Sequence, residues 1–300
     1  MYRKTNLVVA FLIFLLIIPT TALCAGKGGI KHLTSIVRDT ETGRLGMLSG
    51  IFFDENRNRL YVTDTTNKRI LAFDVDLKFV SEFNAGGALE VPASLVRNRK
   101  GQFFVAEPTK GSVLFIDIRQ KSVKPINFSA VPEANSIYPG SIAIDSADNL
   151  YIVDKANRRI LIFDADQRFD RQVLVKGGKG INDVKVDSNG NIYALDTTDR
   201  SVRVFHSQGK LLLTFGKRGK DNGKFDFPVS LAVDRKGLIY VVDQHKHKVL
   251  TFNKRGEFLL EFSQLGWREG RLHYPSYIYV NKAGRIFVVD RGNCRISVFE

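Results

Sequence analysis

A short apolar segment that ends in an acidic residue recurs six times along the chain. The six acidic residues lie 43, 47, 42, 47 and 47 residues apart and are Asp64, Glu107, Asp154, Asp196, Asp243 and Asp290. Each segment is preceded by another apolar segment that ends in a polar turn, such as 141–145, and is followed by a third, such as 160–163. Apolar segments of this length, bounded by Gly, Asn, Asp and Ser, are typical of β-strands.

Most units contain a fourth such segment, for example 211–215 and 258–262. Four strands repeated at a period of 42–47 residues predict an all-β fold, a six-bladed β-propeller of four-stranded blades. The last unit ends after its third strand, and residues 32–37 precede the first unit without a blade of their own. We expect this N-terminal strand to complete the last blade and close the ring. Independent hairpins or a β-sandwich would not require a fixed period.

Residues 1–25 have the pattern of a signal peptide. Arg3 and Lys4 precede an apolar run at 7–18, Pro19 interrupts it, and small residues allow cleavage after Cys24 or Ala25. The sequence therefore predicts a single propeller domain at 26–300, exported to the periplasm or the extracellular space. An uncleaved anchor and a lipid anchor at Cys24 are the alternatives, and only these would attach the protein to a membrane.

The sequence motifs of the repeat resemble those of the NHL family over residues 48–300. The family's motifs appear most fully at 139–145 (PGSIAID), 149–154 (NLYIVD) and 157–160 (NRRI), and the spacer at 215–225 (FGKRGKDNGKF) also matches. The resemblance implies a propeller that serves as a binding platform for proteins or RNA, or as the body of an amidating lyase. The second unit departs from the pattern, because Glu107 replaces Asp and 108–112 lacks the Asn-x-Arg element.

Lys and Arg number 45 against 31 Asp and Glu, a net charge of +14, which favours anionic partners. In a propeller, the loops after the second strands and the loops entering the first strands share one face. Candidate binding residues in the entry loops combine basic and aromatic side chains: Lys217, Arg218, Lys220, Lys224, Trp267, Arg268, Arg271, His273 and Tyr274. A diffusely basic surface is the alternative, because the opposite face carries Arg57, Arg59, Arg99, Lys100, Arg235 and Lys236.

The first strands are expected to line the axis. Their aligned third positions are apolar, small or aromatic except for Lys185, and Asp183 lies on the same strand face. Asp183, Lys185 and Tyr279 are therefore the candidate residues of an axial pocket. The alternative is a structural Asp–Lys ion pair that neutralises itself and binds no ligand. It predicts that replacing Lys185 alone is more harmful than replacing both residues.

The repeated acids are expected to be structural, because a motif present in every blade builds blades. Each carboxylate can accept amides of the following turn and pair with an arginine there, namely Arg69, Arg159, Arg200 or Arg295.

Catalytic residues, metals and cofactors are not predicted. A zinc site of the amidating-lyase kind needs histidines from separate blades, and His245 and His247 lie in one lysine-flanked turn. Asn182 and Asp183 are the one pair suited to a lactonase-type calcium site. We therefore expect an exported, non-enzymatic, monomeric propeller that binds a protein or an anionic polymer such as a glycan. A metal-dependent propeller enzyme is the alternative, and export disfavours a nucleic-acid partner.

Overall fold

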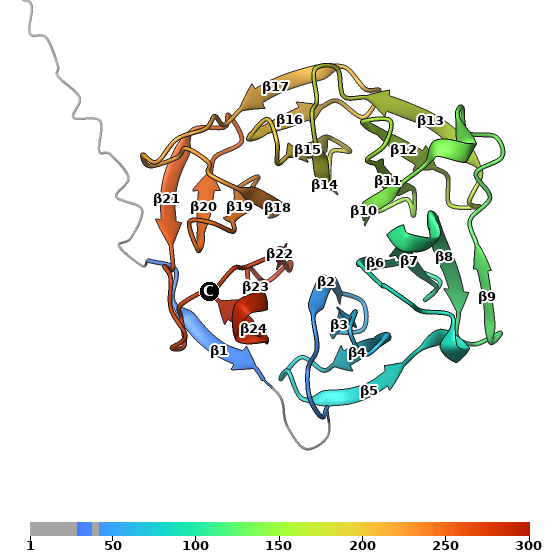
Figure 1. Cartoon of the computed structure of the whole chain (residues 1–300), viewed down its shortest axis with the longest axis horizontal. Helices are drawn as coiled ribbons and strands as arrows, with labels where there is room; N and C mark the ends of the chain where they lie inside the picture. The colour runs from blue at the N-terminus through green and yellow to red at the C-terminus, as the bar shows by residue number, and fades with distance from the viewer. Residues whose placement is uncertain (1–28, 38–41) are drawn as a thin grey trace, which may run out of the picture.

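Six four-stranded antiparallel sheets surround a central axis in the computed structural model (Figure 1). This arrangement confirms the predicted six-bladed all-β propeller. The structure describes residues 29–37 and 42–300, so the predicted signal peptide at 1–25 lies outside the described residues. Within the described ranges, no helix has the length and apolar character needed to cross a bilayer.

The first three blades follow one another along the chain, each beginning at the axis and ending at the rim. Blade 1 consists of β2 (Leu48–Asp54), β3 (Arg59–Asp64), β4 (Arg69–Phe73) and β5 (Phe79–Phe83). Blade 2 consists of β6 (Ser94–Arg97), β7 (Phe103–Glu107), β8 (Ser112–Asp117) and β9 (Ser122–Pro125). Blade 3 consists of β10 (Pro139–Ile144), β11 (Leu150–Asp154), β12 (Arg159–Phe163) and β13 (Phe169–Leu174).

The remaining blades repeat this order until the chain returns to its start. Blade 4 consists of β14 (Ile181–Val186), β15 (Ile192–Asp196), β16 (Ser201–Phe205) and β17 (Leu211–Phe215). Blade 5 consists of β18 (Pro228–Val233), β19 (Ile239–Asp243), β20 (Lys248–Phe252) and β21 (Phe258–Phe262). Blade 6 consists of β22 (Tyr277–Val280), β23 (Ile286–Asp290), β24 (Arg295–Phe299) and β1 (His32–Ile36). Single turns of 3-10 helix occupy four loops: η1 (Ala85–Gly87), η2 (Pro108–Lys110), η3 (Ala134–Ser136) and η4 (Arg291–Asn293).

Strand β1 closes the ring as predicted. It lies antiparallel to β24, with Ile36 opposite Ile296, and the blue and red ends of the chain meet in this blade (Figure 1). Beyond the strand, Lys31 and Glu300 exchange two backbone hydrogen bonds of 2.7 and 2.9 Å. The pairing leaves β24 without an open edge.

The apolar core lies between neighbouring blades. The second strands are buried along most or all of their length, whereas outer strands such as β17 and β21 are exposed or half-buried except at their last residue. One apolar cluster joins blade 6 to blade 1 and includes Phe53, Val62, Phe287 and Val289. Each sheet therefore buries both faces of its inner strands against its neighbours in the ring, which explains the nearly continuous apolar runs of the second and third strands.

In blades 2 to 6, the repeated acids fasten the entry segment to the second strand of the same blade. All six carboxylate residues are fully buried. Asp154, for example, accepts the Tyr138 amide at 3.2 Å and the Arg159 Nε at 2.8 Å. Glu107 likewise accepts the amides of Glu90 and Val91. Buried carboxylates that are saturated in this way stabilise the loops around them.

The predicted arginine partners are correct in three blades and wrong in one. Arg69, Arg159 and Arg295 each direct Nε to the acid of their own blade. In blade 4 the partner of Asp196 is instead Arg203, while Arg200 donates to the Asp226 carbonyl of the next entry loop and to the Thr198 carbonyl of its own turn. The reason is positional: Ser201 occupies the place that the arginine takes in the other three blades, so Arg203, two residues along the same strand, reaches back to the carboxylate.

We expect removal of residues 1–37, which deletes β1, to destabilise the whole propeller. The loss exposes the edge of β24 and the apolar surface around Ile36 and Phe299. Thermal unfolding followed by circular dichroism should show a single transition lowered by about 10 °C, the shift expected for several kcal/mol in a domain of this size. A variant lacking only residues 1–28 is the control. Melting of the two variants within a degree or two of each other would contradict ring closure by β1.

Candidate functional site

The loops after the second strands and the segments entering the first strands lie on one side of the ring, called here the entry face. Backbone hydrogen bonds of 2.9 Å link the two sets, as between Thr65 and Met47, Lys155 and Tyr138, and Gln244 and Phe227. The opposite side, where first and second strands are joined, is called the exit face. The predicted relation between the two loop sets is therefore present in the structure.

A channel of three successive cavities follows the axis. The cavity at the entry face has a volume of about 380 Å³, the middle one about 120 Å³ and the one at the exit face about 470 Å³. Tyr277 lines the first and second, whereas Phe52 and Tyr279 line the second and third. The axial region is thus open to solvent at both faces and narrow in the middle.

Equivalent positions near the start of the first strands form a ring around this channel. They are occupied by Gly50, Ser94, Ser141, Asp183, Ser230 and Tyr277. Several of them bridge neighbouring blades: the Ser94 hydroxyl accepts the amide of Ile142 at 3.2 Å, and the Ser230 hydroxyl accepts that of Ile278 at 3.3 Å. Asp183 is the single carboxylate in a ring of otherwise neutral residues.

Asp183 is buried and its two oxygens receive five donors. Oδ1 accepts from the Ser141 hydroxyl at 2.5 Å, the Lys185 ammonium at 2.5 Å and its neighbour's amide at 2.9 Å. Oδ2 accepts the Ser230 hydroxyl at 2.7 Å and the Leu231 amide at 2.9 Å. The carboxylate therefore ties blades 3, 4 and 5 together at the axis, and its oxygens are fully engaged.

Lys185 is held in its charged form. Burial disfavours the ammonium, but the carboxylate of Asp183 and the phenol of Tyr277 outweigh that effect and raise the Lys185 pKa. Its Nζ lies 4.8 Å from the centre of the Tyr277 ring, a cation–π geometry. Together Asp183 and Lys185 form a neutral buried pair, so the charge of the channel has to come from other residues.

Tyr279 lies farther along the axis than Asp183. It shares the middle cavity with Lys185, and its hydroxyl donates to the Phe53 carbonyl at 3.2 Å. Burial raises the pKa of this phenol. The structure thus brings Lys185 and Tyr279 to one cavity and places Asp183 in the wall of another.

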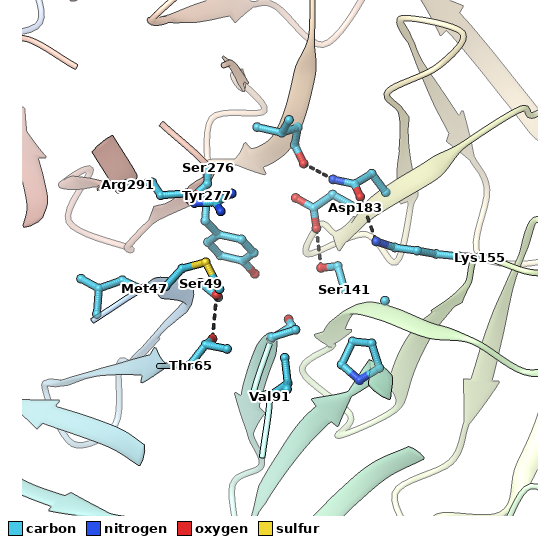
Figure 2. Close-up of a pocket in the computed structure, with 17 residues that line it drawn as sticks. Met47, Ser49, Thr65, Val91, Ser141, Lys155, Asp183, Ser276, Tyr277 and Arg291 are labelled. Atoms are coloured by element: carbon cyan, nitrogen blue, oxygen red, sulfur yellow. Dashed lines mark hydrogen bonds between the residues drawn. The ribbon is translucent and has the colours of Figure 1, made fainter. Parts of the chain in front are cut away.

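Two basic residues of the entry cavity, Lys155 and Arg291, were not assigned to the axis from the sequence. Lys155 and Arg291 directly follow the repeated acids of blades 3 and 6, which oppose each other in the ring. The signal lay in the repeat itself, because the residue after the acid is neutral in the other four blades. Figure 2 shows the two side chains on opposite sides of the cavity, with Tyr277 and Asp183 between them.

Four aromatic rings gather on the entry face beside blades 5 and 6. Trp267, His273, Tyr274 and His247 contact one another, with ring centres 4.8–5.9 Å apart. Trp267 is 71% exposed and Tyr274 46%. These four residues are called the aromatic platform. The guanidinium of Arg295 supports the loop beneath by donating to the carbonyls of Arg268 and Arg271 at 2.8 Å each.

The basic residues of the entry loops differ in how free they are. Lys217, Arg218 and Lys220 are exposed and have no ion pair within the described residues, and the same holds for Arg268. Lys224 instead contacts Asp221. The free charge of this face is therefore smaller than the residue count, as expected for a partly paired surface.

The exit face is not an equivalent basic surface at its centre. The cavity there is lined by six acidic residues and four basic ones, and Arg99 in its wall pairs with Asp148 at 3.1 Å. Arg57, Lys100 and Lys236 lie outside that cavity and are exposed. The two ends of the channel therefore differ in charge.

The donor sets do not fit a metal centre. Within residues 29–37 and 42–300, no group of three or more His, Cys, Asp and Glu side chains converges as a metal site would require. His245 stacks on Phe227, and His247 stacks on His273 with ring centres 5.9 Å apart. Asp183, half of the pair considered for calcium, has both oxygens occupied by hydrogen-bond donors.

Two family models match parts of the chain. Residues 178–268 match a model described as a 6-bladed beta-propeller, and residues 272–299 match the NHL repeat. No curated protein matches the chain.

Several solved structures share the fold at low identity. A streptogramin B lyase is 14% identical with a TM-score of 0.64, over 91% of this chain and 97% of the other. Virginiamycin B lyase from Staphylococcus aureus is 11% identical with a TM-score of 0.63, over 90% and 98%. An auxiliary nutrient binding protein from Bacteroides thetaiotaomicron VPI-5482 is 12% identical with a TM-score of 0.67, over 90% and 76%. At these identities the likeness shows a common fold alone.

The hydrogen bonds around Asp183 predict a different order of stability losses from the one expected from the sequence. Because four donors besides Lys185 hold the carboxylate, Lys185→Met should cost only about 1.5–3 kcal/mol of unfolding free energy. Asp183→Ala strands buried hydroxyls, an amide and the ammonium together, and should cost about 3–5 kcal/mol. Urea denaturation of both variants and of the double variant measures this. A double variant more stable than Lys185→Met would instead support the interpretation in which Asp183 and Lys185 form a simple ion pair.

Proposed function

We propose that this chain, which belongs to the NHL-repeat β-propellers, is an exported binding protein whose entry face captures an anionic polysaccharide. The observation that carries the proposal is the aromatic platform of Trp267, His273, Tyr274 and His247 beside unpaired basic side chains on one face of the disc. Export is inferred from the pattern of residues 1–25.

Charge and aromatic surface have separate roles in this proposal. Lys217, Arg218 and Lys220 raise the rate of encounter with an anion, and salt screens that effect. Trp267 and Tyr274 offer rigid, flat surface at low entropic cost, which supplies affinity once the partner is seated. Arginine next to such rings, as at Arg268, suits carboxylates because its planar group forms paired hydrogen bonds with them.

A polysaccharide is favoured over an acidic protein by the form of the surface. The exposed apolar residues near the platform are few, chiefly Leu265, Trp267 and Tyr274. Stable protein interfaces need a larger packed centre surrounded by a polar rim. Sugar rings carrying carboxylates match a small aromatic surface bordered by cations.

An enzymatic role has weaker support. Two of the similar folds are described as lyases, but the oxygens of Asp183 are saturated and the histidines do not converge on a metal site. The five hydrogen bonds that this carboxylate accepts give it a structural role between blades 3, 4 and 5.

We expect reversal of Lys217, Arg218 and Lys220 to Glu to weaken binding to polygalacturonate by roughly tenfold at low salt, because the attraction becomes repulsion. Biolayer interferometry at low and high salt measures the change. The matched control reverses Arg57, Lys100 and Lys236 on the exit face, which changes the net charge equally. Equal losses in both variants would mean that diffuse charge, not this face, determines binding.

We expect Trp267→Ala to weaken binding to the same polymer severalfold with little dependence on salt, because it removes apolar contact and not charge. Neutral dextran, which carries no carboxylates, serves as the probe that shows how much of the binding depends on the charge of the polymer. The proposal would be contradicted if both Trp267→Ala and the entry-loop reversal bound polygalacturonate as tightly as the unaltered chain. Tight binding of an acidic protein in place of the polymer would indicate a protein partner.

A further inference from the structure

The entry cavity is a built pocket that is separate from the aromatic platform. All six blades contribute to its wall, and its volume of about 380 Å³ suits a small molecule more than a polymer segment. Its polar groups come from rigid strand ends and short turns, as Figure 2 shows for Ser49, Thr65, Ser141 and Ser276.

The residues that follow the repeated acids normally tie one blade to the next. Thr65 donates to the carbonyl of Pro92 at 2.8 Å, and Thr197 donates to that of Pro228 at 2.7 Å. Arg291 occupies the same position in blade 6, but its guanidinium has no hydrogen bond or ion pair with any residue that the structure describes. An arginine released from this structural role is available to a ligand.

Lys155 enters the pocket from the opposite blade. The chain has glycine at 140, where an added Cβ would lie 2.5 Å from the Lys155 side chain, so this glycine makes the room in which the lysine lies. Its Nζ donates to the Asn182 side chain at 3.0 Å, which leaves further donors. Burial lowers the Lys155 pKa, and the field of Asp183 opposes that effect in part.

The pocket has no free acid to balance these two cations. Asp183 is its single acidic lining residue, and Lys185 already neutralises it. In addition, the Ser276 hydroxyl is buried without a hydrogen-bond partner in the described part of the chain. A partly desolvated cation and a buried unpartnered hydroxyl are both stabilised when an anion with polar groups fills the space between them.

We propose that the entry cavity binds a small organic di-acid, with one carboxylate at Lys155 and the other at Arg291, and with the Ser276 hydroxyl, which comes from the same blade as Arg291, as a further hydrogen-bonding partner. Two acids are favoured because the two cations stand on opposite walls and each can pair with its own group. This site is independent of the polysaccharide surface proposed above.

Isothermal titration of the full chain with succinate and citrate tests the proposal, with succinamide as the neutral probe and inorganic phosphate as the simple anion. We expect binding of succinate, of the tricarboxylate citrate, or of both, and none of succinamide. Lys155→Met and Arg291→Met should each weaken that binding by about tenfold or more, because each removes one charge-assisted pair. Arg291→Lys should retain part of it.

Lys176→Met is the matched control, since Lys176 is exposed on an entry-face loop but does not line the cavity. It should bind the acid like the unaltered chain, and so should Trp267→Ala, which separates this site from the polysaccharide surface. Circular dichroism and melting curves establish that each variant is folded. Absence of succinate and citrate binding, binding of phosphate alone, or equal affinity in Lys155→Met and Lys176→Met would each overturn the proposal.

Discussion

A blade of this protein cannot bury its apolar faces alone, and the fold depends on every sheet having a neighbour on both sides. The clusters that hold the molecule together cross from blade to blade, as between Phe53 and Phe287 at the junction of the first and last sheets. That junction exists because β1 joins β24 and completes blade 6. Closure is therefore a condition for the core and for the axial channel, since the channel is only the space that six docked first strands leave between them.

Within this ring, repetition and departure from repetition have different meanings. The buried acids recur in every blade and secure the entry segments, which is a structural role. Departures cluster at the axis: Asp183 replaces a serine, Lys185 replaces an apolar residue, and Lys155 and Arg291 replace uncharged ones. Three of these four charges are partly or wholly buried, which is costly unless each is paired or serves a ligand. Asp183 and Lys185 are paired, and Lys155 and Arg291 are not.

The regular part of this architecture could be predicted from the sequence because it repeats. Spacing of the acids predicted six blades, and the unit that ends at Phe299 without a fourth strand pointed to residues 32–37. The error at Arg200 arose where one blade shifts its arginine by two positions to Arg203, a change that spacing alone does not reveal. The placement of Lys155 opposite Arg291 in the entry cavity was missed for another reason. These two residues are 136 positions apart in the sequence and line one cavity only when the ring is closed. No single repeat therefore contains the information that predicts the pocket.

The charge difference between the two ends of the channel follows from the same closed geometry. Hairpins between first and second strands carry aspartates that cap their own turns, such as Asp145 and Asp187, and five aspartates together with Glu55 line the cavity at the exit face. The entry face gathers the residues that follow the buried acids, and in blades 3 and 6, where Lys155 and Arg291 follow, the acid is already paired with an arginine of its own blade. The lining of the exit cavity is therefore more acidic than that of the entry cavity. This difference arises from turn chemistry that the fold needs in any case, and the two cations at 155 and 291 give the entry cavity its basic lining.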